Sequence, residues 1–104
     1  MQLVNLTPHE INEVTTNLVI PSSGTARVAQ NTTKVNELDG IPVYRTNFDP
    51  STIEGLPAPR KGVVYIVSAL VLNAIGDRTD CVAPGNAVRD IDGKVVGCRG
   101  FRTT

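Results

Sequence analysis

Arginine, glycine and aromatic residues form the most distinctive chemical grouping in this chain. The segment VVGCRGF, residues 95–101, combines two glycines with a thiol, a guanidinium group and an aromatic ring. Residues 78–104 carry five basic residues, four of them arginine, against three acidic ones. A planar guanidinium group matches the oxygens of a phosphate in a bidentate manner. This grouping therefore indicates recognition of a ligand that carries phosphate.

Other residues that could hold an anion lie at the ends of expected elements. Ser68 follows a predicted strand and opens a predicted helix, where its hydroxyl and free backbone N–H groups form a small anion site. Gly97 would let a ligand approach the backbone. The predicted ligand-binding residues are Arg45, Ser68, Arg78, Asp80, Arg89, Gly97, Arg99 and Phe101. The alternative interpretation makes Ser68 a simple helix cap and the arginines solvated ends of strands.

Residues for catalysis or metal binding are few. A hydrolytic triad needs a histidine base beside a nucleophile, and His9, in the segment NLTPHEI, is expected to face solvent or to bond the backbone. A zinc site needs about four ligands, two of them usually close in sequence, whereas Cys81 and Cys98 are 17 residues apart. The sequence contains no Walker loop or dinucleotide fingerprint. We expect no catalytic residue, no metal and no cofactor.

Composition indicates one domain over residues 1–104 with an aliphatic core. Hydrophobic residues make up 40% of the chain and aromatic residues only 4%. Ten basic residues balance ten acidic ones, so no overall field attracts nucleic acid or a membrane. The apolar run at residues 63–75 is too short to span a bilayer. Without a signal sequence, Cys81 and Cys98 are expected to stay reduced in a cytoplasm, and a disulfide between them is the less favoured alternative.

Glycine and proline divide the first half of the chain into extended segments. LVNLTPHEINEV predicts two short strands around a corner at Thr7–Pro8. NLVIPSSGTARVAQ predicts a strand, a turn at Pro21–Gly24 and a second strand. TKVNELDGIPVYRTN predicts a hairpin that turns at Asp39–Gly40.

Residues 48–62 predict a surface loop, and after it the sequence becomes more continuously apolar. The apolar run at residues 63–67 predicts a central strand buried on both faces. Residues 68–76 predict a short helix, capped by Ser68 and ended by Gly76. The predicted fold is therefore α+β and predominantly β: a mostly antiparallel or barrel-like sheet with one short helix and a C-terminal hairpin.

The C-terminal hairpin turns at Asp92–Gly93. A two-residue turn would pair Ile91 with Lys94, whereas a type I turn with a left-handed Gly93 would pair Asp90 with Lys94. We favour the second register because it places opposite charges across from each other. Pro84–Gly85, upstream, fits a type II turn that would present Asp80 to a ligand or simply connect to the hairpin.

The favoured register pairs Val88 with Val96 and assigns the two faces of the hairpin, since strand side chains alternate. The predicted core face holds Val88, Val96 and Cys98. The predicted outer face holds Arg89, Val95, Gly97, Arg99 and Phe101. Two arginines would then flank a low floor made by Ala87 and Gly97.

Several blocks of the chain resemble small proteins encoded by tailed phages and prophages of bacteria. The blocks are NLTPHEI, GIPVYRT, EGLPAP, YIVSALV, RTDCVAPG and VRDIDGKVVGCRGF, and they cover nearly the whole chain. The resemblance implies a phage gene product that acts in the cytoplasm of the host bacterium. Some small phage proteins are sponges, oligomers that sequester cyclic nucleotide or cyclic ADP-ribose immune signals without cleaving them. By analogy with that class, we expect a non-catalytic, homo-oligomeric binding protein.

Two other functions remain open. A protein-binding module, either an inhibitor of a host enzyme or an accessory of virion assembly, would use the segment FDPSTIEGLPAP, residues 48–59, as its contact, with the arginines as a polar rim. An enzyme that hydrolyses nucleotide signals would need a base or a metal set that the sequence does not offer. We favour the sponge hypothesis because the arginine grouping indicates phosphate binding and the sequence offers no candidate catalytic residues beside it.

Overall fold

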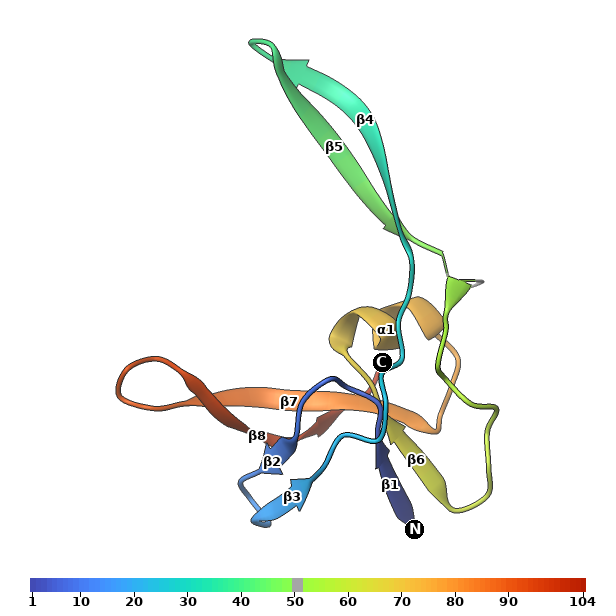
Figure 1. Cartoon of the computed structure of the whole chain (residues 1–104), viewed down its shortest axis with the longest axis vertical. Coiled ribbons are helices and arrows are strands. Elements are labelled where there is room, and N and C mark those ends of the chain that lie inside the picture. Colours follow the sequence, from blue (N-terminus) through green and yellow to red (C-terminus); the bar gives the residue numbers. More distant parts are fainter. Residues whose placement is uncertain (50–51) are drawn as a thin grey trace.

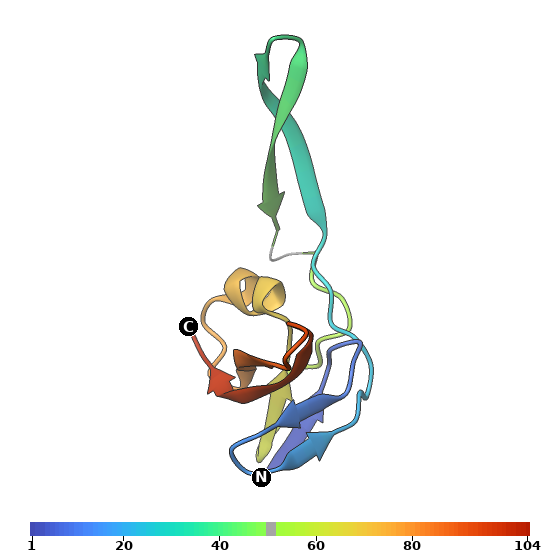
Figure 2. The same ribbon diagram turned by 90° about the vertical axis from the view of Figure 1, so that its left-hand side faces the viewer.

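A small curled sheet, one helix and a long projecting hairpin make up the computed structural model, which describes residues 1–49 and 52–104 (Figures 1 and 2). The predominantly β, α+β fold with one short helix and a C-terminal hairpin is confirmed for the described residues. The elements are β1 (Gln2–Asn5), β2 (Ile11–Glu13), β3 (Leu18–Ile20), β4 (Gln30–Leu38), β5 (Ile41–Phe48), β6 (Val63–Ile66), α1 (Ala69–Ile75), β7 (Cys81–Arg89) and β8 (Val95–Arg102).

The larger sheet curls until its two outer strands nearly meet. Its six strands run in the order β1-β6-β7-β8-β2-β3. The long β7–β8 ladder and the β2–β3 pair are antiparallel, whereas β6 pairs in parallel with both β1 and β7. One parallel pair, Glu13 with Cys98, joins β2 to β8. A bridge from Asn5 to Ser22, just after β3, returns to β1, so the barrel-like arrangement is confirmed.

The β6 strand carries side chains into two separate cores, as a strand buried on both faces does. Tyr65 and Val67 pack under α1 with Val71 and Leu72. Ile66 points to the other side of the sheet. There it packs in a second cluster whose buried members are Ile11, Ile20, Ile66 and Cys98. The prediction of a central strand at residues 63–67 is confirmed, and this strand holds the two halves of the body together.

The helix begins and ends where the sequence indicates. Ser68 has extended backbone angles, and its hydroxyl accepts a hydrogen bond from the N–H of Val71 at 3.3 Å. Gly76 ends the helix with a left-handed φ of 64°, which glycine adopts without strain. Val71 and Leu72 face the sheet and are buried.

The C-terminal hairpin has the predicted turn but not the predicted register. Gly93 is left-handed with a φ of 81°, and the N–H of Asp90 donates to the carbonyl of Lys94 at 2.9 Å. A second irregularity follows, however, so that Val88 lies opposite Gly97 and not opposite Val96. Val96 is 46% exposed, so its predicted place on the core face is wrong.

Packing against β2 explains this register. A Cβ atom on Gly97 would lie 2.7 Å from the carbonyl oxygen of Asn12 and 2.8 Å from Val14 Cγ1. Only glycine fits at such a close approach. Because the contact with β2 fixes where β8 lies, the charge pair at the turn cannot set the register beyond the turn.

Pro84 and Gly85 lie inside β7, so the predicted type II turn is wrong. Pro84 pairs with Phe101 across the ladder. A Cβ atom on Gly85 would lie only 2.2 Å from the carbonyl oxygen of Arg99. The glycine permits close contact between two strands, a role that leaves the same sequence signature as a turn.

The strand expected after Pro21–Gly24 does not form as an independent element before β4. Arg27 instead makes an isolated bridge with Glu54, through backbone hydrogen bonds of 2.9 and 2.8 Å. This bridge fastens the chain just before β4. The predicted loop at residues 48–62 is largely irregular where it is described, and residues 50 and 51 lie outside the described residues.

Strands β4 and β5 form an arm that projects from the body (Figures 1 and 2). Asp39 and Gly40 have φ angles of 50° and 82°, as a type I′ turn requires, which confirms the hairpin prediction. The molecule measures 51 × 40 × 21 Å, and its radius of gyration of 16.3 Å exceeds the about 13 Å expected for a compact chain of this length.

Candidate ligand-binding site

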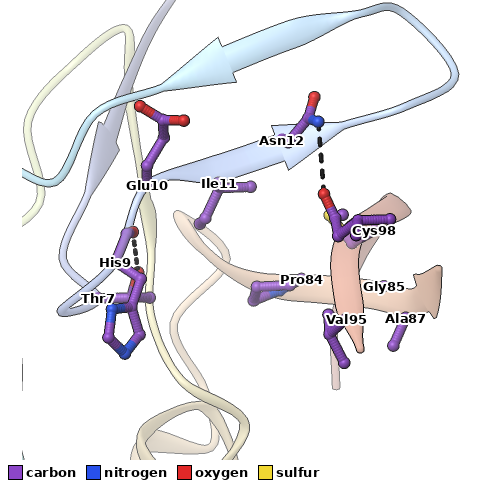
Figure 3. Close-up of a pocket in the computed structure, with 12 residues that line it drawn as sticks. Thr7, His9, Glu10, Ile11, Asn12, Pro84, Gly85, Ala87, Val95 and Cys98 are labelled. Atoms are coloured by element: carbon purple, nitrogen blue, oxygen red, sulfur yellow. Dashed lines mark hydrogen bonds between the residues drawn. The ribbon is translucent and has the colours of Figure 1, made fainter. Parts of the chain in front are cut away.

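A pocket of about 510 Å³ lies between the chain that leads into β2 and the C-terminal hairpin (Figure 3). One wall is formed by four residues with polar side chains and by the apolar Ile11; the polar ones are Thr7, His9, Glu10 and Asn12. The opposite wall is mostly apolar. Its residues are Pro84, Gly85, Ala87, Val95, Val96, Gly97 and Cys98. A polar wall facing an apolar one suits a flat ligand with hydrogen-bonding edges.

A buried asparagine makes the polar wall rigid. The side-chain amide of Asn5 donates to the carbonyl oxygens of His9 at 2.9 Å and Ile20 at 3.0 Å. Its Oδ1 atom accepts from the N–H of Thr7 at 3.0 Å and from the Thr7 hydroxyl at 2.6 Å. Ser22 Oγ donates to the carbonyl of Thr7 at 2.6 Å. The segment NLTPHEI is therefore a hydrogen-bonded corner that fixes where His9 and the following residues lie.

The two arginines of the hairpin lie on opposite faces. Arg99 pairs with Asn86, so these two share a face. Arg89 lies three residues after Asn86 on β7 and points to the other side, since strand side chains alternate. That side also carries Ala87, which lines the pocket. The predicted pair of arginines on one surface is therefore wrong, and Arg89 is the one on the pocket's face.

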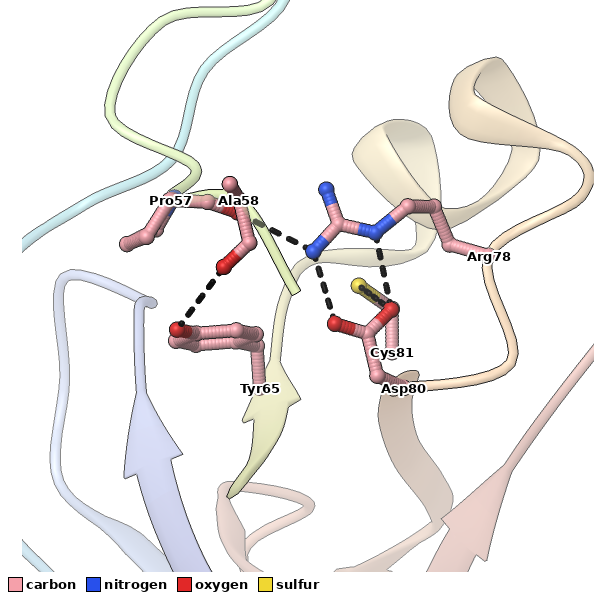
Figure 4. Close-up of polar contacts among 6 residues, drawn as sticks. All are labelled: Pro57, Ala58, Tyr65, Arg78, Asp80 and Cys81. Atoms are coloured by element: carbon pink, nitrogen blue, oxygen red, sulfur yellow. Dashed lines mark hydrogen bonds and ion pairs between the residues drawn. The ribbon is translucent and has the colours of Figure 1, made fainter. Parts of the chain in front are cut away.

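Arg78 and Asp80 form a partly buried ion pair (Figure 4). Arg78 Nε donates to one oxygen of Asp80 at 2.8 Å and Nη2 to the other at 2.7 Å. The hydrogen bonds raise the pKa of Arg78 and lower the pKa of Asp80. Nη2 also donates to the carbonyl of Pro57 at 3.0 Å. Both side chains thus fasten the loop before β7 to residues 57–58, where Tyr65 also reaches Ala58.

The other predicted residues are spread over the molecule. Ser68 caps α1, and Arg45 lies on the exposed arm opposite Thr33. Phe101 packs half-buried against the barrel-side core, the cluster whose buried members are Ile11, Ile20, Ile66 and Cys98. Of the eight predicted residues, all within the described chain, only Gly97 lines the pocket between residues 7–12 and the hairpin.

A buried carboxylate below the pocket ties β2 to β8. Glu13 is 3% exposed, and it accepts a hydrogen bond from the N–H of Gly100 at 2.7 Å. It also accepts from the N–H and hydroxyl groups of Thr15 and Thr16. These donors, Gly100 first, lower the pKa of Glu13 from 4.5 to about 2. The arrangement holds the RGF segment against the turn after β2, so Gly100 serves the fold.

The two cysteines are buried on opposite sides of the sheet. Cys81 is 0% exposed in the core under α1, and Cys98 is 5% exposed in the barrel-side core. Burial is the main cause that raises the pKa of Cys81 to about 11, and burial also raises the pKa of Cys98. The placement of the two residues in separate cores keeps their thiols apart in the folded chain.

We therefore expect both thiols of the folded protein to resist Ellman's reagent at neutral pH. A thiol reacts as the thiolate, and burial raises the pKa of both thiols, although Cys98, which lines the pocket, is the more accessible of the two. Two equivalents should react once the chain is unfolded in guanidinium chloride. Reaction of either thiol within seconds in the native protein would contradict this placement.

The pocket wall at residues 7–12 was missed because its signal is indirect. The sequence predicts that His9 faces solvent or bonds the backbone, and in the fold its backbone position is held by the buried Asn5 four residues earlier. An asparagine that bonds the backbone two residues on is a recognised turn former, and Asn5 followed by Thr7–Pro8 is the signal that could have indicated a fixed corner.

Comparison with known proteins assigns neither a family nor a function to the chain. No family model, curated protein or solved structure that was compared with the chain matches it. Within the described residues, no group of three or more His, Cys, Asp or Glu side chains could hold a metal ion. The described residues also include no helix long and apolar enough to cross a membrane.

Proposed function

We propose that this protein binds a small nucleotide-type ligand in the pocket between residues 7–12 and the C-terminal hairpin, and that it does so without changing the ligand chemically. The observation that carries the proposal is the pairing of a polar wall with an apolar one around about 510 Å³. Ligand pockets measure roughly 300–1,000 Å³ and combine apolar walls with a few polar groups.

The pocket offers a place for each part of such a ligand. A base would lie against Pro84 and Ala87, while the side chains of His9 and Asn12 meet its polar edges. Asn12 uses one amide hydrogen for the carbonyl of Val96 at 3.4 Å, which leaves its side-chain oxygen as an acceptor. A phosphate would lie outside the pocket, where Arg89 shares the face of Ala87. Arg89 donates from one nitrogen to the carbonyl of Gly93 at 2.7 Å, which orients the guanidinium.

The phage resemblance supports a role against bacterial defence. The blocks NLTPHEI and VRDIDGKVVGCRGF, which carry part of that resemblance, supply much of the two walls of the pocket. We propose that the protein acts in the cytoplasm of an infected bacterium and sequesters an immune signal of the cyclic nucleotide or cyclic ADP-ribose type. The buried, protonated thiols of Cys81 and Cys98 favour sequestration, since a thiol nucleophile must ionise.

Arg89→Ala should weaken binding of the ligand about tenfold, because a charge-assisted hydrogen bond to phosphate is lost at a solvent-facing site. Arg99→Ala is the matched control: it removes the same side chain from the same hairpin on the opposite face, and should leave affinity unchanged. The measurement is isothermal titration calorimetry with a panel of cyclic dinucleotides, cyclic trinucleotides and cyclic ADP-ribose isomers.

Three results would count against this function. The first is the absence of binding to every member of the panel at micromolar concentration. The second is an equal loss of affinity in Arg89→Ala and Arg99→Ala, which would place the phosphate elsewhere. The third is conversion of any ligand, detected by mass spectrometry, which would make the protein an enzyme.

The arm formed by β4 and β5 favours a second function, a protein-binding module that inhibits a host enzyme or assists virion assembly. Leu38 and Ile41 are exposed at its tip, and exposed apolar patches mark surfaces that contact another protein. A pull-down from host lysate discriminates: one stoichiometric host protein, with no small molecule retained, would favour the module over the sequestering protein.

A further inference from the structure

The arm carries an apolar face at its tip, where Leu38 and Ile41 are exposed. Leu38 and Ile41 lie opposite each other beside the turn and are 60% and 66% exposed. Val43 shares their face, because it lies two residues after Ile41 on the same strand. A two-stranded hairpin is marginally stable alone in water. The arm therefore needs a surface to pack against.

The chain exposes more surface than a protein of its mass does when folded by itself. Its accessible area is 7106 Å², whereas a monomer of 11.1 kDa is expected to expose about 5,650 Å². The excess is about 1,450 Å², more than the roughly 800 Å² that each partner buries in a standard stable interface. A dimer in which each chain buries this excess would have an interface as large as those of permanent assemblies.

The edges of the arm are protected against simple strand addition. A bulge between Lys34 and Asn36 interrupts β4, and Pro42 on β5 has no N–H group to donate. Bulges and prolines are the devices that keep edge strands from pairing with other chains. The contact is therefore made by the apolar face, with Leu38 and Ile41 at its centre, and not by the backbone edges.

Charge permits a second copy of this chain as the partner. The whole chain has ten basic and ten acidic residues, so two copies do not repel each other. The arm is neutral as well: Lys34 and Arg45 balance Glu37 and Asp39. We propose that the arm packs against a second copy through the face of Leu38, Ile41 and Val43, so that two copies form a symmetric dimer.

Sedimentation equilibrium of the wild-type protein tests this proposal directly. We expect a mass of twice 11.1 kDa at micromolar concentration. Leu38→Ser combined with Ile41→Ser should weaken dimerisation at least tenfold. Thr32→Ser combined with Thr46→Ser is the matched control, because this pair lies across the same arm on the opposite face. Both cores lie outside the arm, so circular dichroism should show that every variant folds.

Cross-linking of the wild-type protein gives a second test that needs no variant. The chain has three lysines, of which Lys34 lies on the arm and Lys61 and Lys94 do not. In a mixture of nitrogen-14 and nitrogen-15 protein, mixed-isotope cross-links should include Lys34. A wild-type monomer would overturn the proposal. So would a dimer insensitive to the tip variant, or one cross-linked only through Lys61 and Lys94. Neither test uses the ligand pocket, so failure of one proposal is distinguishable from failure of the other.

Discussion

Glu13→Gln is expected to lower the thermal unfolding midpoint by several degrees, although it changes only one atom of the side chain. The carboxylate of Glu13 faces donors alone: the N–H of Gly100 and the N–H and hydroxyl groups of Thr15 and Thr16. An amide would turn an NH₂ group toward some of these donors, so that contacts with a buried carboxylate which now attract would repel. Differential scanning calorimetry measures the midpoint.

The same substitution should also change how stability depends on pH. The pKa of Glu13 is about 2 in the folded chain against an ordinary value of 4.5, so the carboxylate stabilises the fold above pH 4.5. This contribution is lost as the pH falls from about 4.5 toward 2. The difference in stability between wild type and Glu13→Gln should shrink over that range.

Glu10→Gln provides the control for both effects. It is the same substitution three residues earlier, on an exposed side chain at the pocket wall, and it should leave the midpoint unchanged. A wild-type-like midpoint for Glu13→Gln at neutral pH would show that the hydrogen bonds to Gly100 and the threonines do not stabilise the fold.

Gly85→Ala should destabilise the protein by about 3 kcal/mol or more, the cost of forcing an atom into a filled space. The new Cβ atom would lie 2.2 Å from the carbonyl oxygen of Arg99 and 2.8 Å from that of Gly100. Both obstacles are backbone atoms of β8 and cannot rotate away. Chemical denaturation should show the loss, and the unfolding midpoint should fall by more than about 10 °C.

Gly62→Asn separates this steric effect from the general cost of replacing glycine. Gly62 has a left-handed φ of 77° but open space where a Cβ atom would lie, and asparagine tolerates that conformation better than most residues. This variant should remain close to wild type. If Gly85→Ala were equally mild, β7 and β8 would have to separate easily at Gly85, which would contradict the tight ladder.

Local patterns in the sequence predicted the elements whose causes are local. Asp39–Gly40 gave the hairpin turn, Ser68 and Gly76 gave the limits of α1, and the apolar run at residues 63–67 gave the central strand. The register of β8 was predicted wrongly because its cause is a contact with β2, more than 80 residues away. The same long-range packing explains Gly85, whose neighbour Pro84 made a turn the simpler interpretation.

The candidate site was predicted less well than the fold. The arginines were grouped by their closeness in sequence, yet alternation along β7 separates Arg89 from Arg99. Arg78 was expected to meet a ligand, but Asp80 two residues later provides a closer charge. The sequence predicts a corner at Thr7–Pro8, but the part played by the buried Asn5 depends on Ile20 and Ser23, which reach Asn5 only in the folded chain.

The parallel pairings described above impose an order on folding. β1 pairs with residues 63–66, and β2 meets β8 through Glu13 and Cys98. During synthesis β1 has no strand partner until β6 emerges from the ribosome, and β2 has only β3, whereas β4 and β5 are adjacent in the chain. Contacts between distant segments slow folding because the intervening loop must first be ordered. A protein built this way should close its barrel last, when β8 reaches β2 and Gly100 bonds Glu13.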